Sequence, residues 1–291
     1  MNPEGKIATL KRNEGERTLE YEISQHSSFI AAMISFPFPE SFLWGTASSS
    51  FQIEGAANLD GKSDSIWDVA CRLYPERFSR GATPETAAGF YHHFREDIRQ
   101  MKELGLKSFR LSLAWPRLFP NGDRCLNPKG ADFYHAVIDE LLSHGIEPFV
   151  DLYHWDLPQV LQDQGGFANR ELVEHFANYA EDCFRLYGDR VKYWSTFNEP
   201  SVITFSSYAY GAFPPFERSL QKAAVAAHHL LLMHYEAIRR YRSLGLNGKI
   251  GAVIAFVPVY PAAPGTDDDG AAQRQLDMVC NWWLKPMFLG E

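Results

Sequence analysis

A regular alternation of strand-like and helix-like stretches, beginning near Phe36, constrains the fold of this chain more than any other feature. The candidate strands are short runs rich in β-branched and aromatic residues, at positions 42–45, 108–113, 146–152, 191–198 and 250–257. Amphipathic patterns typical of helices separate and follow them, at about 87–104, 128–144, 170–187, 219–244 and 270–288. This order predicts a parallel sheet with right-handed crossovers, and no domain linker interrupts it.

About five βα units can be counted, so the fold class is α/β. Five units suit either an open doubly wound sheet or part of a (β/α)8 barrel, which needs eight units in about 250 residues. No Gly-x-Gly-x-x-Gly turn follows the first strand and no Gly-x-x-x-x-Gly-Lys loop is present, which argues against dinucleotide-binding and P-loop folds. The sequence also stops directly after a helical pattern. We therefore expect a (β/α)8 TIM barrel truncated after about five βα units.

The segment before this alternation has a different character. Residues 1–33 are polar and lack a helical or strand period, so we expect a disordered amino-terminal extension. Met33 offers an alternative start, because organised sequence begins directly after it. The partial barrel would then occupy residues 34–291.

Composition limits the partners and the compartment. The formal net charge of −8, with no block of Lys or Arg, argues against a nucleic-acid surface. No apolar run is long enough to span a bilayer, and no signal-peptide pattern is present, so no membrane partner is expected. Cys71, Cys125, Cys183 and Cys280 have neither paired nor metal-ligand spacing. We expect free thiols, a cytoplasmic location, and no metal or other cofactor.

Polar side chains that suit sugar chemistry gather at the ends of the candidate strands. They are Gln52 after the first strand, Arg110 in the second, His154 and Trp155 after the third, and Asn198 and Glu199 at the end of the fourth. A barrel brings all of these to one face, where amides and imidazoles pair with hydroxyls and an indole stacks on the apolar face of a sugar. Pro200 ends the fourth strand and places Glu199 where barrels keep their catalytic groups.

Each of these side chains also has a purely structural interpretation. Arg110 can pair with a structural carboxylate, His154 can be a hydrogen-bonded core histidine, and Gln52 can cap its own loop. Trp155 can belong to the core, and Glu199 can cap the following turn. Because these residues lie at four successive strand ends, we favour one shared site over a separate structural role for each residue.

Four segments closely resemble the family 1 glycoside hydrolases, the β-glucosidase family. The first is Pro-Glu-Ser-Phe-Leu-Trp-Gly-Thr-Ala at 39–47, followed by Phe-Gln-Ile-Glu-Gly at 51–55. The others are Phe-Arg-Leu-Ser-Leu-Ala-Trp-Pro-Arg-Leu-Phe-Pro at 109–120, Leu-Tyr-His-Trp-Asp-Leu-Pro at 152–158 and Thr-Phe-Asn-Glu-Pro at 196–200. The resemblance runs without a gap from about residue 36 to residue 291.

The resemblance implies a role for each of the site residues. Glu199 would be the general acid/base, and Gln52, His154 and Asn198 would bind hydroxyls of the non-reducing sugar. Trp155 joins them as a substrate-binding residue. Arg110 would lie under the catalytic nucleophile and hold it ionised. The expected partner is a small β-glycoside or oligosaccharide.

One part of the family pattern is absent. The nucleophile of the family is a second Glu in a Glu-Asn-Gly segment on the seventh strand, and this sequence contains no Glu-Asn-Gly. We therefore expect the encoded protein to be a retaining β-glycosidase and the 291-residue chain alone to be inactive. Two alternatives stay open, a 6-phospho-β-glycosidase and a non-catalytic sugar-binding remnant. Oligomeric state is not determined by any of these features.

Overall fold

The structure is a computed structural model that describes residues 38–79 and 82–290. The extension expected at 1–33 lies outside these residues. The fold described below is that of the unit from Trp44 to Glu291, within the described residues.

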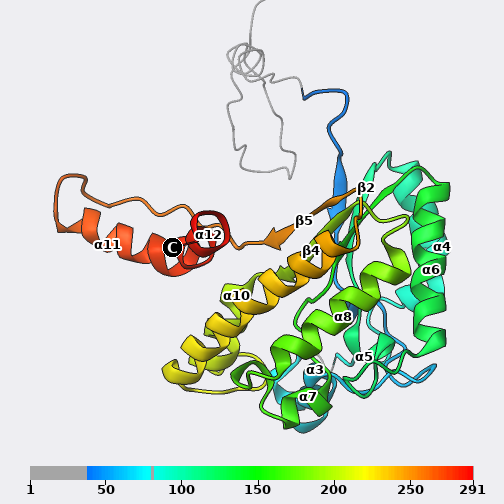
Figure 1. The fold of residues 1–291 in the computed structure, drawn as a ribbon, viewed down its shortest axis with the longest axis horizontal. Helices are drawn as coiled ribbons and strands as arrows, with labels where there is room; N and C mark the ends of the chain where they lie inside the picture. Colours follow the sequence, from blue (N-terminus) through cyan, green and yellow to red (C-terminus); the bar gives the residue numbers. More distant parts are fainter. Residues whose placement is uncertain (1–37, 80–81, 291) are drawn as a thin grey trace, which may run out of the picture. The chain divides into compact units, whose positions relative to one another are not determined.

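Five parallel strands form the sheet of the described residues, in the order β1-β2-β3-β4-β5 (Figure 1). They are β1 (Gly45–Ala47), β2 (Ser108–Ser112), β3 (Glu147–Asp151), β4 (Tyr193–Asn198) and β5 (Lys249–Val253). Each strand pairs with the next one along the chain, so the sheet has none of the reversed strand order that defines a doubly wound fold. This is the arrangement of five consecutive units of a (β/α)8 barrel, as the sequence predicted.

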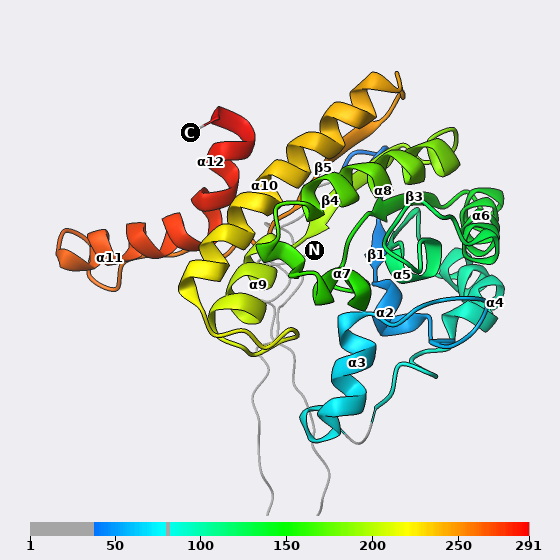
Figure 2. The same ribbon diagram turned by 60° about the horizontal axis from the view of Figure 1, so that its bottom comes forward.

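Helices connect the strands and cover one face of the sheet (Figures 1 and 2). The long helices are α4 (Phe90–Glu103), α6 (Pro128–Ser143), α8 (Leu172–Tyr187) and α10 (Leu220–Ser243). Short helical segments lie at α2 (Ser50–Ile53), α3 (Ile66–Leu73), Pro75–Arg77, α5 (Trp115–Leu118), α7 (Gln159–Asp163), Gly166–Ala168, α9 (Pro200–Val202) and Ile203–Ala209. Helix α4 packs on α6 and α8 packs on α10, while α6 contacts β3 and α10 contacts β4. None of the helices within 38–79 and 82–290 is both long and apolar enough to cross a membrane.

The first strand lies later in the chain than the sequence predicted. The apolar run at 42–45 was expected to form it, whereas the ladder pairs Gly45–Ala47 with Ser108 to Arg110. A Cβ atom added to Gly45 would stand 2.4 Å from the backbone oxygen of Ser108. So close an approach requires glycine here.

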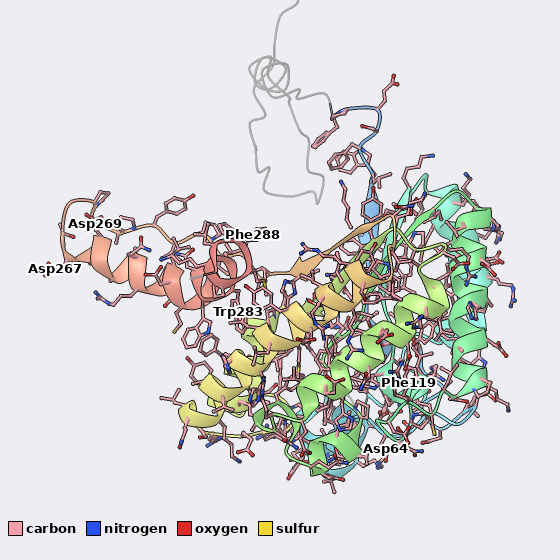
Figure 3. The ribbon with its side chains drawn as sticks, in the orientation of Figure 1. Asp64, Phe119, Asp267, Asp269, Trp283 and Phe288 are labelled. Atoms are coloured by element: carbon pink, nitrogen blue, oxygen red, sulfur yellow. The ribbon has the colours of Figure 1, made fainter. Side chains whose placement is uncertain are left out.

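The carboxyl-terminal helical region is divided. One helix was expected over 270–288, but the structure has α11 (Asp267–Leu276), a π-helical turn (Asp277–Asn281) and α12 (Trp282–Leu289). Figure 3 shows Asp267 and Asp269 in the first turn of α11, where carboxylates interact favourably with the helix dipole. On α12, Trp283 is fully buried while Phe288 is 78% exposed.

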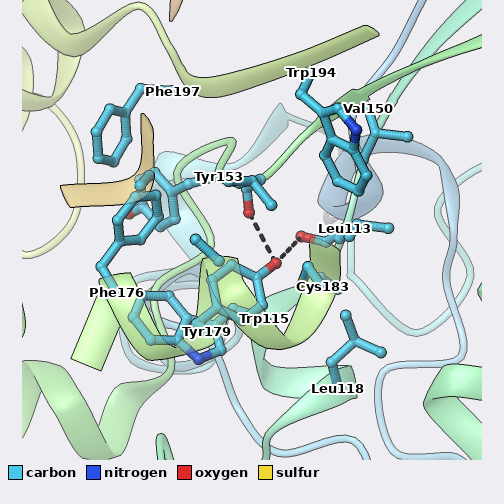
Figure 4. Packing of buried hydrophobic residues seen from close by; sticks show 14 of the residues in the cluster. Leu113, Trp115, Leu118, Val150, Tyr153, Phe176, Tyr179, Cys183, Trp194 and Phe197 are labelled. Carbon is cyan, nitrogen blue, oxygen red and sulfur yellow. Dashed lines mark hydrogen bonds between the residues drawn. The ribbon is translucent and has the colours of Figure 1, made fainter. Parts of the chain in front are cut away.

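Aromatic side chains fix α8 to the ends of the central strands (Figure 4). The hydroxyl of Tyr179 donates hydrogen bonds to the backbone oxygens of Leu152, at 2.8 Å, and Leu113, at 3.4 Å. Its ring stacks on Trp115 with centroids 4.5 Å apart. Because these carbonyls follow β3 and β2, the contacts hold the carboxyl-terminal edge of the sheet in place.

Candidate active site

Asn198, the last residue of β4, is the centre of a polar cluster at the carboxyl-terminal edge of the sheet. Its Oδ1 accepts a hydrogen bond from Nη1 of Arg110 at 3.0 Å, and its Nδ2 lies 3.1 Å from Nε2 of His154. Because an amide nitrogen can only donate, Nε2 of His154 is the acceptor and the ring carries its proton on Nδ1. Asn198 is 3% exposed and His154 is 8% exposed, so these bonds are shielded from water.

An irregularity in β4 turns Asn198 toward this cluster. The register between β4 and β5 shifts between Ser195 and Asn198, and Asn198 pairs with Val253. The residue before it, Phe197, packs outward on α8, where its ring stacks on Phe176 at 4.7 Å. An extra residue in a strand re-aims the side chains that follow, and such irregularities are frequent beside active sites.

Asp151, the last residue of β3, completes the cluster, and sequence reasoning missed it. Its Oδ2 lies 3.5 Å from Nη1 of Arg110 and 3.7 Å from Nδ1 of His154. Its Oδ1 accepts a hydrogen bond from the hydroxyl of Ser195. Burial raises the pKa of Asp151, while the neighbouring His154 and Arg110 oppose that rise. The available signal was a carboxylate within the apolar run of the third strand.

Glu199 and Trp155 border the cluster in strained backbone conformations. Glu199 has φ 51° and ψ 66°, and its backbone nitrogen donates to the oxygen of Val253 at 2.8 Å. Trp155 has φ 77°, and its Nε1 donates to the backbone oxygen of Asn198 at 2.9 Å. Left-handed conformations are costly for residues other than glycine and gather at functional sites. The Glu199 carboxylate is half-buried and forms no hydrogen bond or ion pair with another residue of the described chain.

Gln52 is not joined to the cluster. It lies on α2 with an exposed side chain that makes no hydrogen bond to a described residue. Its loop is nevertheless anchored, because Oγ of Ser50 donates to Oδ2 of Asp156 at 2.7 Å and the Ser50 nitrogen donates to Oγ of Ser112 at 2.7 Å. Burial raises the pKa of Asp156 to about 7, and the hydrogen bond from Ser50 opposes that rise.

The structure thus brings most of the residues expected from the sequence together. Arg110 and His154 each contact the side chain of Asn198, and Trp155 is hydrogen-bonded to the backbone of Asn198. Glu199 follows Asn198 directly in the chain. The Glu199 carboxyl group, which has no hydrogen bond or ion pair to another described residue, therefore lies beside a rigid set of amide, imidazole and guanidinium groups.

Comparison with known proteins identifies what this arrangement is similar to. The model of glycosyl hydrolase family 1 matches residues 34–291. Among curated proteins, Beta-glucosidase A of Acetivibrio thermocellus is 41% identical over 89% of this chain and 57% of its own length. The 6-phospho-beta-glucosidase GmuD of Bacillus subtilis is 43% identical over 88% of this chain and 55% of its own length.

Solved structures agree with the family match. The family 1 β-glucosidase from Thermotoga maritima has a TM-score of 0.85 and 41% identity, covering 87% of this chain and 57% of the Thermotoga chain. The psychrophilic β-glucosidase BglU from Micrococcus antarcticus has a TM-score of 0.84 and 43% identity over 88% of this chain and 54% of its own. The chain spans little more than half the length of these relatives. It belongs to glycosyl hydrolase family 1.

Proposed function

We propose that the complete gene product is a retaining β-glycosidase of the β-glucosidase type, which removes terminal β-linked sugars from O-glycosides. The observation that carries this proposal is the Arg110–His154–Asn198 cluster, with Glu199 next to it at the end of β4. Rigid donors and acceptors of this kind match the hydroxyls of a sugar. The names of the relatives, which include β-glucosidases, support the same reaction.

Each site residue has a role in the proposed reaction. Glu199 protonates the leaving oxygen and later deprotonates water. His154 and Asn198 bind sugar hydroxyls, and Trp155 supports the ring. Gln52 joins them from the loop after β1 when substrate is present.

Arg110 has a different task, because it holds the attacking carboxylate in its ionised form. Retaining hydrolysis needs that second carboxyl group about 5–5.5 Å from the acid/base. The 291-residue chain contains no Glu-Asn-Gly segment to supply it. We therefore expect this chain by itself to be inactive, and a chain that carries the remaining barrel units of the family to be active. The proposed reaction uses no cofactor.

Two other functions have specific support. GmuD and the aryl-phospho-β-D-glucosidase BglC of Bacillus subtilis, each 43% identical, favour a 6-phospho-β-glycosidase. A sugar-binding remnant without catalysis is the second alternative, because the 291-residue chain contains no Glu-Asn-Gly segment to supply the nucleophile.

The test compares substrates and chain lengths in one series. The complete gene product and the 291-residue chain are each assayed with an aryl β-glucoside and its 6-phosphate, and NMR follows the anomer first released. We expect the β-anomer from the plain glucoside and only from the complete gene product. An inverted first product would overturn the retaining mechanism, and turnover of the 6-phosphate alone would assign the phospho-glycosidase. If the complete gene product bound the sugar but hydrolysed neither substrate, it would be a non-catalytic sugar-binding remnant.

The proposed location is the cytoplasm. All four cysteines are free, which is the usual state in a reducing compartment. The net charge of −8 also disfavours nucleic-acid and anionic membrane partners. Fractionation of source cells with an antibody to this chain tests the proposal, and recovery from a secreted or membrane fraction would contradict it.

A further inference from the structure

Asp151 occupies a position where a fold alone would favour an apolar residue. It ends β3 between its register partners Ser112 and Ser195, and it is 0% exposed. Removal of a carboxylate from water costs several kcal/mol unless partners compensate for it. A buried acid at this point therefore implies that its charge interacts favourably with neighbouring side chains.

The side chains around Asp151 form a closed circuit over three strands. Asp151 Oδ2 is 3.5 Å from Nη1 of Arg110, which donates to Asn198 at 3.0 Å. Asn198 in turn bonds to Nε2 of His154 at 3.1 Å, and Nδ1 of His154 returns to Asp151 at 3.7 Å. Ser195 holds the other carboxylate oxygen from β4. Every member of the circuit thus has two neighbours that limit its rotation.

Each of the three charged or titratable members of this circuit carries a buried polar atom. Asp151 Oδ2, His154 Nδ1 and Arg110 Nε are buried and make no hydrogen bond within the described part of the chain. Nδ1 of His154 therefore faces the carboxylate at 3.7 Å with no hydrogen-bond acceptor among the described residues, whereas Nη1 of Arg110, 3.5 Å from the carboxylate, also donates to Asn198. Their attraction to Asp151 is the interaction that orients them.

We propose that Asp151 is a positioning residue that holds Arg110 and His154 in the orientation in which Asn198 links them and a sugar meets them. This inference rests on the proposed glycosidase function for the identity of the ligand, whereas the positioning itself does not. The carboxylate fixes the proton of His154 on Nδ1, which leaves Nε2 as the acceptor. It also balances the positive charge of Arg110 with a carboxylate from the neighbouring strand β3.

Two substitutions separate positioning from packing. Asp151→Asn keeps the shape and one acceptor but removes the charge, while Asp151→Val keeps similar volume and removes both. The matched control is Asp68→Asn, which alters another buried acid, 1% exposed, that is paired with Lys62 at 2.8 Å and is not a member of the Asp151 circuit. All three variants are made in the complete gene product.

The first measurement is the ¹⁵N spectrum of the histidine rings, with His154 assigned from the His154→Gln variant. Wild type should show the Nδ1–H form, and Asp151→Val should shift the His154 signals strongly. Asp151→Asn should shift them less, and Asp68→Asn should leave them in place. Unmoved His154 signals in both Asp151 variants overturn the proposal, whatever happens to stability.

The second measurement is the split between KM and kcat for an aryl β-glucoside. A misplaced sugar-binding group weakens ground state and transition state alike, so KM should rise about tenfold in Asp151→Val with a smaller change in kcat. An unchanged KM in both variants overturns the role in sugar binding. If wild type hydrolyses no glycoside, the proposed function fails, and the histidine signals alone then decide whether Asp151 positions the cluster. If Asp151→Val does not fold, the isosteric Asp151→Asn supplies both measurements.

Discussion

The two faces of the sheet differ in what their side chains do. On the face covered by helices, Leu111, Val150 and Trp194 are between 0% and 3% exposed. On the opposite face, Phe149 and Tyr193 remain half-buried. The covered face is a continuous apolar core, whereas the inner face and its carboxyl-terminal edge carry the polar cluster. The comparison teaches that stability and chemistry depend on different sides of the same strands. Substitutions on the covered face should therefore lower the free energy of unfolding, and substitutions at the polar cluster should lower activity.

The largest expected effect is on chemistry, from Glu199→Gln in the complete gene product. If Glu199 is the general acid, as proposed, its loss should slow glycosylation about 10²–10⁴-fold for glycosides with poor leaving groups. Activated aryl glycosides, which leave without protonation, should change least, and the midpoint of unfolding should stay the same. The measurement is a series of leaving groups of different basicity. An equal loss for all of them would remove Glu199 from the acid role.

A substitution on the covered face is expected to lower stability. Trp194 packs its ring edge-on against Phe184 with centroids 5.0 Å apart, and its Nε1 donates to the oxygen of Val191 at 3.1 Å. Trp194→Ala leaves a large cavity and should lower the free energy of unfolding by about 3–5 kcal/mol. The adjacent Tyr193→Ala on the inner face should cost about 1 kcal/mol. Denaturant unfolding of both variants measures the difference, and equal losses would contradict the contrast between the faces.

A pH dependence should mark the buried interface between α10 and β4. Burial lowers the pKa of His234 to about 4, and its Nδ1 lies 2.8 Å from Oγ1 of Thr196. The folded state therefore favours neutral His234. Its contribution is complete above about pH 6.5 and is lost as the pH falls through 6.5 toward 4, at a cost on the order of 3 kcal/mol.

Unfolding measured at pH 7.5 and pH 4.5 tests this dependence. His234→Gln should reduce the difference in stability between the two pH values, whereas the exposed His92→Gln should leave it unchanged. An undiminished pH dependence in His234→Gln would show that other groups cause it. The same result would also mean that water reaches this part of the covered face.

The covered face was the easier part to predict from the sequence. Residues such as Leu111, Val150 and Trp194 repeat with the period of two that strands require, and the helices repeat with their own period. The same pattern placed Arg110 and Asn198 on strands and His154 just after one, so their convergence followed from the parallel order. The first strand was displaced, because the close approach of backbones at Gly45 has no hydrophobic signal, and the fifth strand and the last helix also differ from their expected bounds.

The rest of the site depends on contacts between distant segments. Asp151 was missed because the role of a carboxylate inside an apolar strand becomes visible only from its contacts with Arg110 and His154. These residues are 41 and 3 positions away in the sequence. The turn of Asn198 toward the cluster depends on an irregular register with β5. The place of Gln52 depends on the bond from Ser50 to Asp156, which joins loops 106 positions apart. No local pattern encodes these distances.

The smallest effect on stability, and the sharpest test of the inner edge, should come from Gln52→Ala. The side chain is exposed and bonds to no described residue, so its loss should change the free energy of unfolding by less than about 0.5 kcal/mol. If Gln52 binds a sugar hydroxyl when substrate enters, KM for an aryl β-glucoside should still rise about tenfold, because one hydrogen bond is lost in both ground and transition states. The exposed Gln100→Ala on α4 is the matched control and should alter neither quantity. An unchanged KM in Gln52→Ala would leave the loop after β1 outside the sugar site, and would confine that site to the edge formed by β2, β3 and β4.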